Sequence, residues 1–199
     1  MNTLLGYLRQ AGTAVRFLAL ATLVLGLLYP VAVFGLGQVL APAQANGSIL
    51  KDAAGNPAAS TRLVQAPADE KGVQDQRWFH ARPSAVKWDP ASSSASNLGP
   101  NDPNLAKNVE AARETVAAAE GIDPARVPAD AVTASGSGLD PSISVAYAQL
   151  QVPRIAAAHR LSDNEVKALV ERNTTSGLEA FLGQPSVNVT TLNLDLATR

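Results

Sequence analysis

The stretch FLALATLVLGLLYPVAVFGLG, residues Phe17–Gly37, decides the architecture of this chain because it contains no charged side chain. Only threonine, glycine and proline interrupt its apolar residues. A helix rises about 1.5 Å per residue, so about 20 residues cross the ~30 Å hydrocarbon core of a bilayer. Backbone groups in hydrocarbon must be satisfied within the segment itself, which favours a helix. The stretch therefore predicts one transmembrane helix over residues 17–37.

Proline and small residues within this segment predict its local structure and packing. Pro30 leaves the carbonyl of Gly26 without its helical donor, so we expect a kink there, which membrane helices tolerate. Ala19, Thr22, Gly26 and Pro30 recur at roughly helical spacing and form a stripe of small side chains. Such a stripe lets another helix approach closely, but small residues are also common in membrane helices without a partner. The sequence leaves both interpretations open.

A secretory signal peptide is the alternative to a permanent span. Ala43-Gln44-Ala45 resembles an A-x-A cleavage site, and cleavage there would give a mature chain starting at Asn46, a free secreted binding protein. Signal peptides carry an apolar region of only about 7–15 residues, and the present run is longer. The sequence therefore favours an uncleaved anchor, with the secreted binding protein as the alternative.

The charges that flank the apolar run predict its orientation. Arg9 and Arg16 are the only charged residues before Lys51. Because positive charge is retained on the cytoplasmic side, we expect residues 1–16 in the cytoplasm and residues 38–199 outside the membrane. The expected fold is a single N-terminal transmembrane helix followed by an extracytoplasmic α+β domain.

The overall composition excludes several classes of function. The 199 residues include 16 basic and 17 acidic side chains, and this balance gives no basic patch for nucleic acid. The absence of cysteine excludes disulfides, thiolate zinc sites, iron–sulfur clusters and cysteine nucleophiles.

Neither histidine of the chain lies in a metal-binding motif. His80 and His159 are far apart, and neither belongs to an H-E-x-x-H sequence, so we expect no metal site. His80 has Trp78, Phe79 and Arg82 as near neighbours, a pattern typical of an aromatic anchor with polar tips. We therefore expect no catalytic residue here.

The glycines of VTASGSGLDP, residues Val132–Pro141, invite comparison with phosphate-binding loops. A P-loop needs a lysine after its last glycine, whereas Leu139 and Asp140 follow Gly138 here. Gly136 and Gly138 also lack the spacing of a nucleophile elbow. The segment instead predicts a tight turn beside a short strand.

Loops dominate the first half of the soluble part. Residues 38–88 are rich in proline, glycine and alanine, and Thr61–Gln65 is expected to form at most a short strand. DPASSSASNLG, residues Asp89–Gly99, is small and polar and predicts a loop.

Helix signals follow from residue 102 onward. Asp102 before Pro103 is an N-cap followed by proline at the first helical position, and Gly121 is expected to end this helix. A second helix should begin near Ser144, and Pro153 must break or restart it.

The last forty residues predict one more helix and a strand. Ser162 and Glu165 form a capping box at a helix start. Val187–Val189 alternates with polar residues like a strand, and Leu192–Leu196 resumes the alternation one residue out of phase. This slip indicates a bulge or a change of element at Thr190–Thr191. The soluble part is therefore expected to be α+β with a small sheet.

Several short blocks, in order along nearly the whole chain, resemble the C chain of the bacterial potassium-transporting P-type ATPase, the Kdp complex. They are Tyr29-Pro30, Gly37-Gln38, PAQANGSIL (Pro42–Leu50), WFHARPSA (Trp78–Ala85), SNLGPNDPNL (Ser96–Leu105), VTASGSGLDPSIS (Val132–Ser144), QVPRIA (Gln151–Ala156), FLGQPSVNV (Phe181–Val189) and LNL (Leu192–Leu194). The chain departs from the family at ASTRLVQ (Ala59–Gln65), which lacks two glycines, and at Ser94-Ala95, which replaces a glycine pair.

The resemblance implies an accessory subunit of the bacterial inner membrane. Its implied partners are a channel-like potassium-binding subunit, a P-type pump subunit that ATP phosphorylates, and a small single-helix subunit. The chain has no D-K-T-G-T motif, so it is not the phosphorylated catalytic subunit.

Two functions follow from the resemblance. In one, the chain is a structural and regulatory subunit. In the other, it is a catalytic chaperone that raises the pump subunit's affinity for ATP, and the implied nucleotide contact falls on Gln151 and Arg154 of the Q-x-P-R block. No tightly bound cofactor is expected, because ATP would reach the complex through the pump subunit. Gln151 beside a proline break is as readily interpreted as a helix-end cap.

Overall fold

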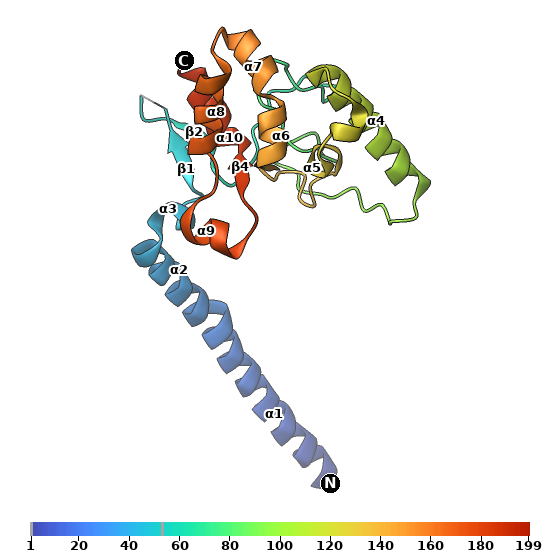
Figure 1. Cartoon of the computed structure of the whole chain (residues 1–199). Coiled ribbons are helices and arrows are strands. Elements are labelled where there is room, and N and C mark those ends of the chain that lie inside the picture. Colours follow the sequence, from blue (N-terminus) through green and yellow to red (C-terminus); the bar gives the residue numbers. More distant parts are fainter. Residues whose placement is uncertain (1, 53) are drawn as a thin grey trace. The chain divides into compact units, whose positions relative to one another are not determined.

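The computed structural model describes residues 2–52 and 54–199. The chain divides into two compact units, an N-terminal unit that ends at Ser48 and a C-terminal unit that begins at Ile49. The N-terminal unit is almost entirely helical (Figure 1). Its elements are α1 (Asn2–Leu23), the π-helical turn η1 (Val24–Leu28), α2 (Tyr29–Leu40) and the short α3 (Pro42–Ala45).

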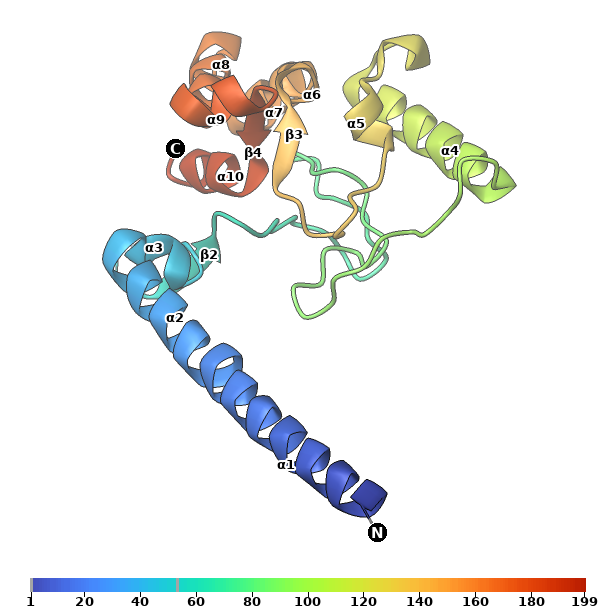
Figure 2. The same ribbon diagram turned by 90° about the horizontal axis from the view of Figure 1, so that it is seen from below.

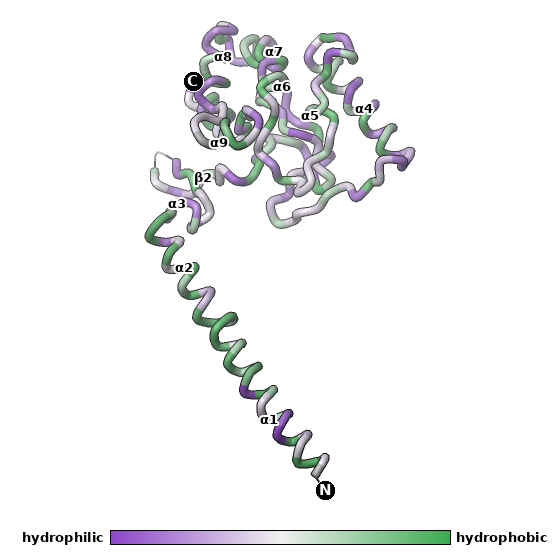
Figure 3. The backbone as a smooth tube through the Cα atoms, turned by 60° about the horizontal axis from the view of Figure 1, so that its bottom comes forward, coloured by the Kyte–Doolittle hydropathy of each residue, from purple (hydrophilic) through white to green (hydrophobic). Residues whose placement is uncertain are grey.

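The apolar helix is longer than the expected span. The segment Thr3–Leu40 is long and apolar enough to cross a membrane, and none of its most apolar window is buried. Figure 3 shows this apolar character along most of its length. The expectation of one long apolar N-terminal helix is confirmed.

A π-helical turn lies directly before Pro30. In the turn Val24–Leu28, backbone N–H groups donate to carbonyls five residues earlier in the chain. The N–H of Tyr29, for example, donates to the carbonyl of Val24. Proline cannot donate a backbone hydrogen bond, and this π-turn is a departure from regular α-helix just before Pro30. The kink expected at Pro30 stays a prediction.

Among the described residues of the C-terminal unit, four strands form two small antiparallel sheets. β1 (Ile49–Lys51) pairs with β2 (Pro57–Ser60), and β3 (Ser142–Ser144) pairs with β4 (Ser186–Asn188). In the second sheet Ile143 faces Val187 across the pair, and both side chains are buried.

Helices make up most of the remaining regular structure. They are α4 (Pro103–Glu120), the 3-10 turn η2 (Pro124–Arg126), α5 (Ala129–Val132), α6 (Val145–Leu150), α7 (Val152–His159), α8 (Asp163–Arg172), α9 (Gly177–Leu182) and α10 (Val189–Ala197). Figures 1 and 2 show α6, α7, α8 and α10 gathered about the β3–β4 pair, with α4 and α5 together at one side. The predicted α+β class is confirmed.

The predicted helix ends agree with the structure. The carboxylate of Asp102 accepts the N–H of Asn104, and Gly121 ends α4 with a left-handed φ of 65°. Ser144 caps α6, and α7 starts afresh beside Pro153. At α8 the capping box of Ser162 and its glutamate partner is complete in both directions.

The prediction of a short strand over Thr61–Gln65 is wrong, because the strand β2 ends at Ser60. Beyond that point the backbone pairs with separate elements rather than with one neighbouring strand. The N–H of Val64 donates to the carbonyl of Leu139 at 2.9 Å, and the N–H of Gln65 donates to Thr190 Oγ1 at 3.1 Å.

The phase slip near the C-terminus marks a change of element rather than a bulge. β4 ends at Asn188, whose side chain accepts the N–H groups of Thr190 and Thr191 and so caps α10. The switch occurs slightly earlier than expected. Leu192 and Leu196 are then buried one helical turn apart.

Candidate functional site

Gln151, one of the two residues that the family resemblance singled out, lies at the junction of α6 and α7 and is fully buried. Its side-chain amide pairs with the backbone of one residue. Oε1 accepts the N–H of His80 at 2.7 Å, and Nε2 donates to the carbonyl of His80 at 3.3 Å. The amide of Gln151 therefore makes the two hydrogen bonds with the backbone of His80 that a neighbouring strand would otherwise make.

The same pairing repeats at the residues on either side of His80. Asn193 Oδ1 accepts the N–H of Phe79 at 2.9 Å, and its Nδ2 donates to the carbonyl at 3.0 Å. Gln74 Oε1 accepts the N–H of Ala81 at 2.7 Å, and its Nε2 donates to the carbonyl at 3.2 Å. We call these three pairings the amide ladder.

The amide ladder satisfies a buried segment that has no secondary structure of its own. Residues 79–81 lie outside every strand, yet all three are buried. An unpaired backbone polar group in such a place costs about 1–3 kcal/mol, so pairing all six groups is essential to the fold. The amides come from the chain before the segment, from the α6–α7 junction and from α10.

Arg154, the second residue singled out, binds the amide ladder from α7. Its Nη2 donates to Gln151 Oε1 at 2.8 Å, and its Nε donates to Glu120 Oε1 at 2.9 Å. Nη1 donates to the carbonyls of Trp78, at 3.0 Å, and Gln76. The structure therefore brings the two predicted residues together, in contact with α4 and with the segment that precedes residues 79–81.

Burial governs the electrostatics of this cluster. The side chain of Glu120 is 1% exposed, and burial raises the pKa of its carboxyl even though the charge of Arg154 acts against this. Its second oxygen, Oε2, has no hydrogen-bond partner among the described residues. Burial, with the charge of Arg154 as a second cause, lowers the pKa of His80 to about 4, so its imidazole is neutral at pH 7.

A cavity of about 230 Å³ lies against His80 and Tyr147, between the core and α4. Most of its lining is apolar, and neither Gln151 nor Arg154 contributes to it. Within residues 2–52 and 54–199, no three acidic or histidine side chains are arranged to hold a metal ion. The cluster around Arg154 is therefore a packed junction in this structure, and the nucleotide contact stays a prediction.

The sequence did not identify three residues of this junction. Gln74 and Glu120 lie in a loop and at a helix end where no spacing marks them, while Asn193 belongs to the LNL block. The one available signal was a polar residue next to Leu192, which becomes fully buried.

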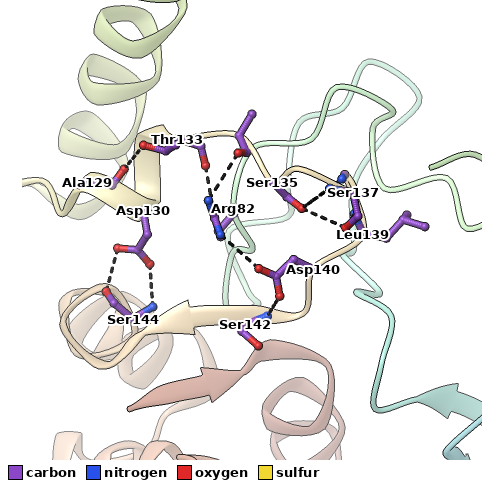
Figure 4. A network of polar contacts seen from close by, with 12 residues as sticks. Arg82, Ala129, Asp130, Thr133, Ser135, Ser137, Leu139, Asp140, Ser142 and Ser144 are labelled. Atoms are coloured by element: carbon purple, nitrogen blue, oxygen red, sulfur yellow. Dashed lines mark hydrogen bonds and ion pairs between the residues drawn. The ribbon is translucent and has the colours of Figure 1, made fainter. Parts of the chain in front are cut away.

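A second polar network joins two blocks that the sequence had singled out separately (Figure 4). Arg82 Nη1 pairs with Asp140 at 3.2 Å, and its other nitrogens donate to the carbonyls of Thr133 and Ala134. Nearby, the carboxylate of Asp130 accepts both the N–H and the hydroxyl of the cap residue of α6. The arginine of WFHARPSA thus fixes the loop that leads into β3.

Gly138 stands at the tightest point of that loop. Its φ is +72°, and a Cβ there would lie 2.6 Å from Val86 Cγ2 and 2.9 Å from the carbonyl of Ser94. The hydroxyl of Ser84 also donates to the carbonyl of Gly138 at 2.8 Å. The expected tight turn is therefore present. Its glycine allows Val86 and the backbone of Ser94 to pack closely against the turn, and it does not form part of a phosphate site.

On the apolar N-terminal helix, the small-residue stripe lines a shallow groove. Ala19, Thr22 and Gly26 lie along it, together with larger side chains of the same helix. This geometry is what a close helix contact requires.

Among the described residues, these features define one N-terminal helix that is long and apolar enough to span a membrane, followed by an α+β domain held together by side-chain-to-backbone pairing. A sequence model of the family described as "KdpC: K+-transporting ATPase, c chain" matches residues 11–198. The chain belongs to this family.

Similar curated proteins support the same family. One, named "Potassium-transporting ATPase KdpC subunit" from Kineococcus radiotolerans, is 47% identical over 191 residues, which cover 95% of this chain and 93% of the relative. Proteins of the same name from Caulobacter sp. strain K31 and Methylibium petroleiphilum are each 44% identical, over 90% and 93% of this chain and 89% and 94% of their own lengths. Family membership favours a membrane-anchored subunit over the free secreted binding protein.

Proposed function

We propose that this chain is a non-catalytic subunit that stabilises the assembled potassium-transporting ATPase and regulates its pump subunit from outside the membrane. The observation that carries the proposal is the engagement of Gln151 and Arg154. Both side chains make their hydrogen bonds inside the domain, which supports a structural role. Its partners in this proposal are the channel-like potassium-binding subunit, the pump subunit and the single-helix subunit.

The charges before the span support an indirect effect on ATP. Arg9 and Arg16 favour a cytoplasmic N-terminus, so the domain would lie on the side of the membrane opposite to ATP. A subunit that binds one state of the pump more tightly shifts the pump toward that state. Such coupling is typically worth about 1–3 kcal/mol, or roughly 5–150-fold in apparent ATP affinity.

Single cysteines test the orientation, because the chain has none of its own. Ser93→Cys places a thiol in an exposed loop of the domain, and Thr3→Cys places one before the span. A membrane-impermeant thiol reagent should label Cys at 93 in intact cells and Cys at 3 only after the cells are broken open. The opposite pattern would overturn the orientation and restore a direct contact with ATP.

The amide ladder offers a matched pair of variants for the two functions. Gln151→Ala and Asn193→Ala each remove one buried amide that pairs with the backbone. If the role is structural, both variants should lower thermal stability and alter the apparent ATP affinity of the purified complex in parallel. If Gln151→Ala alone weakened ATP affinity while stability stayed normal, the direct nucleotide contact would be supported and the proposal would fail.

A further inference from the structure

The most exposed large apolar side chains described in the C-terminal unit lie next to each other at the end of α9. Phe181 is 82% exposed and Leu182 is 79% exposed. On the apolar N-terminal helix, the highest value is the 79% of Val39. These two side chains are therefore as open as those of a segment that is suited to lipid.

The tip that carries them stands on a fixed base. The N–H of Thr175 donates to the carbonyl of Ser186 at 2.8 Å, and the N–H of Ser186 donates back to Thr175 Oγ1 at 3.0 Å. The next residue, Val187, is fully buried in the core. Figure 1 shows α9 at the end of the loop that this base closes. The apolar pair is thus presented by an anchored loop and does not fold back onto the core.

Charge is almost absent around this tip. Between Arg172 and Asp195 the sequence contains one charged residue, Glu179. Moving the tip into an apolar phase would therefore desolvate little charge. The lack of basic residues also means that anionic lipid is not required for such a contact.

The covalent link to the apolar helix indicates which apolar phase is within reach. Residues 41–48 join Leu40 to the first residue of the C-terminal unit. A fully extended chain spans at most about 3.5 Å per residue, so these eight residues, four of which form the helix α3, reach at most about 28 Å. A domain tethered in this way stays beside the bilayer, whichever side of the membrane it occupies.

We propose that Phe181 and Leu182 insert into the interfacial layer of the bilayer and give the domain a second contact with lipid besides its transmembrane helix. The occupant of this apolar surface is a zwitterionic phospholipid bilayer. Exposed apolar patches mark protein or membrane interaction sites, and interfacial helices bury phenylalanine and leucine side chains at the boundary of the headgroups and acyl chains. The contact restricts how the tethered domain can rotate above the membrane.

Lipid-quenching fluorescence tests the proposal with the full chain in phosphatidylcholine vesicles. Gln184→Cys, an exposed position beside the tip, carries a polarity-sensitive fluorophore, and Ser93→Cys carries the same label on a different exposed loop. Lipids with a nitroxide near the headgroup should quench the label at 184 more strongly than the label at 93. Adding Phe181→Ser and Leu182→Ser should abolish this difference, whereas Val73→Ser, at another exposed apolar residue, should preserve it.

Three outcomes would overturn the proposal. Equal quenching at the two labels would show that the tip does not enter lipid. Quenching at 184 that survives the double serine change would assign the contact to other residues. Protection of the tip that appears only in the assembled complex, without lipid quenching, would assign the surface to a partner subunit. Unchanged circular dichroism melts verify that the serine variants fold.

Discussion

Replacing Arg154 by methionine should destabilise the domain strongly, because it leaves Glu120 buried without its ion-pair partner. The side chains of this pair are 11% and 1% exposed, so water cannot replace the lost contact. Removing one partner of a buried pair costs about 3–5 kcal/mol. For a domain of this size, each kcal/mol shifts the midpoint of thermal unfolding by about 2–4 °C, which gives a total of roughly 6–20 °C.

A double-mutant cycle separates the pair from the other contacts of Arg154. Glu120→Gln removes the buried charge but leaves Arg154 bonded to Gln151 and to the carbonyl of Trp78, so it should cost about 1.5–3 kcal/mol. The double variant should be more stable than Arg154→Met alone, with a coupling of about 0.5–3 kcal/mol. Additive costs would refute the inference that the two side chains act as one unit.

The pH dependence of the Arg154→Met variant provides a second readout. Arg154 lowers the pKa of Glu120 and also that of His80, so its loss raises both. When the pKa of a carboxyl is raised in the folded state, the protein loses stability as pH rises. When the pKa of a histidine is no longer lowered in the folded state, the protein loses less stability at low pH. The defect of Arg154→Met should therefore be smaller at pH 5 than at pH 7. The fluorescence of Trp78 and Trp88, the two tryptophans of the chain, can follow unfolding of the full chain in detergent.

Three further predictions follow from individual positions. Gly138→Ala should cost about 2–4 kcal/mol in thermal unfolding, because the left-handed φ and the contact with Val86 both oppose a Cβ, whereas Gly136→Ala has open space and should be tolerated. His80 has a pKa lowered from 6.5 to about 4, so the unfolded state binds its proton first, and stability should fall by about 3 kcal/mol as pH drops from 7 to 4. Gly26→Leu should reduce co-purification with partner subunits by filling the groove of the small-residue stripe.

Matched variants provide the controls for these predictions. His80→Gln should flatten the decline at low pH, whereas His159→Gln keeps the His80 imidazole and should keep the decline. Gly35→Leu adds the same side chain outside the groove and should leave co-purification normal. Equal effects of Gly26→Leu and Gly35→Leu, or a tolerated Gly138→Ala, would contradict the packing described above.

Local signals explain why helix ends were predictable from the sequence. Asp102 caps a helix two residues away, and Ser162 pairs with Glu165 three residues away, so each signal and its effect lie within one turn. The apolar run of the N-terminal helix is equally local. The strand expected over Thr61–Gln65 failed for the opposite reason, because its partners are at Leu139 and Thr190, far along the chain.

The amide ladder could not be predicted from the sequence for this same reason. His80 and Gln151 are 71 positions apart, and Phe79 and Asn193 are 114 positions apart. No periodicity connects a glutamine at a helix junction to the backbone of a loop, since such pairing depends on the whole fold. The proline two residues after Gln151 correctly indicated a helix end at this position, but it did not indicate which group the side-chain amide of Gln151 binds.

The position of the Q-x-P-R block explains why one motif supports two interpretations. Pro153 interrupts the helical hydrogen bonds between α6 and α7, and the break leaves Gln151 as the cap between the two helices. From there its amide holds His80, and Arg154, placed three residues later, reaches the same amide and Glu120 of α4. A glutamine and an arginine at this spacing would suit a nucleotide, but they suit a buried carbonyl and a buried carboxylate equally well. The proposed structural role requires only groups that this chain itself supplies.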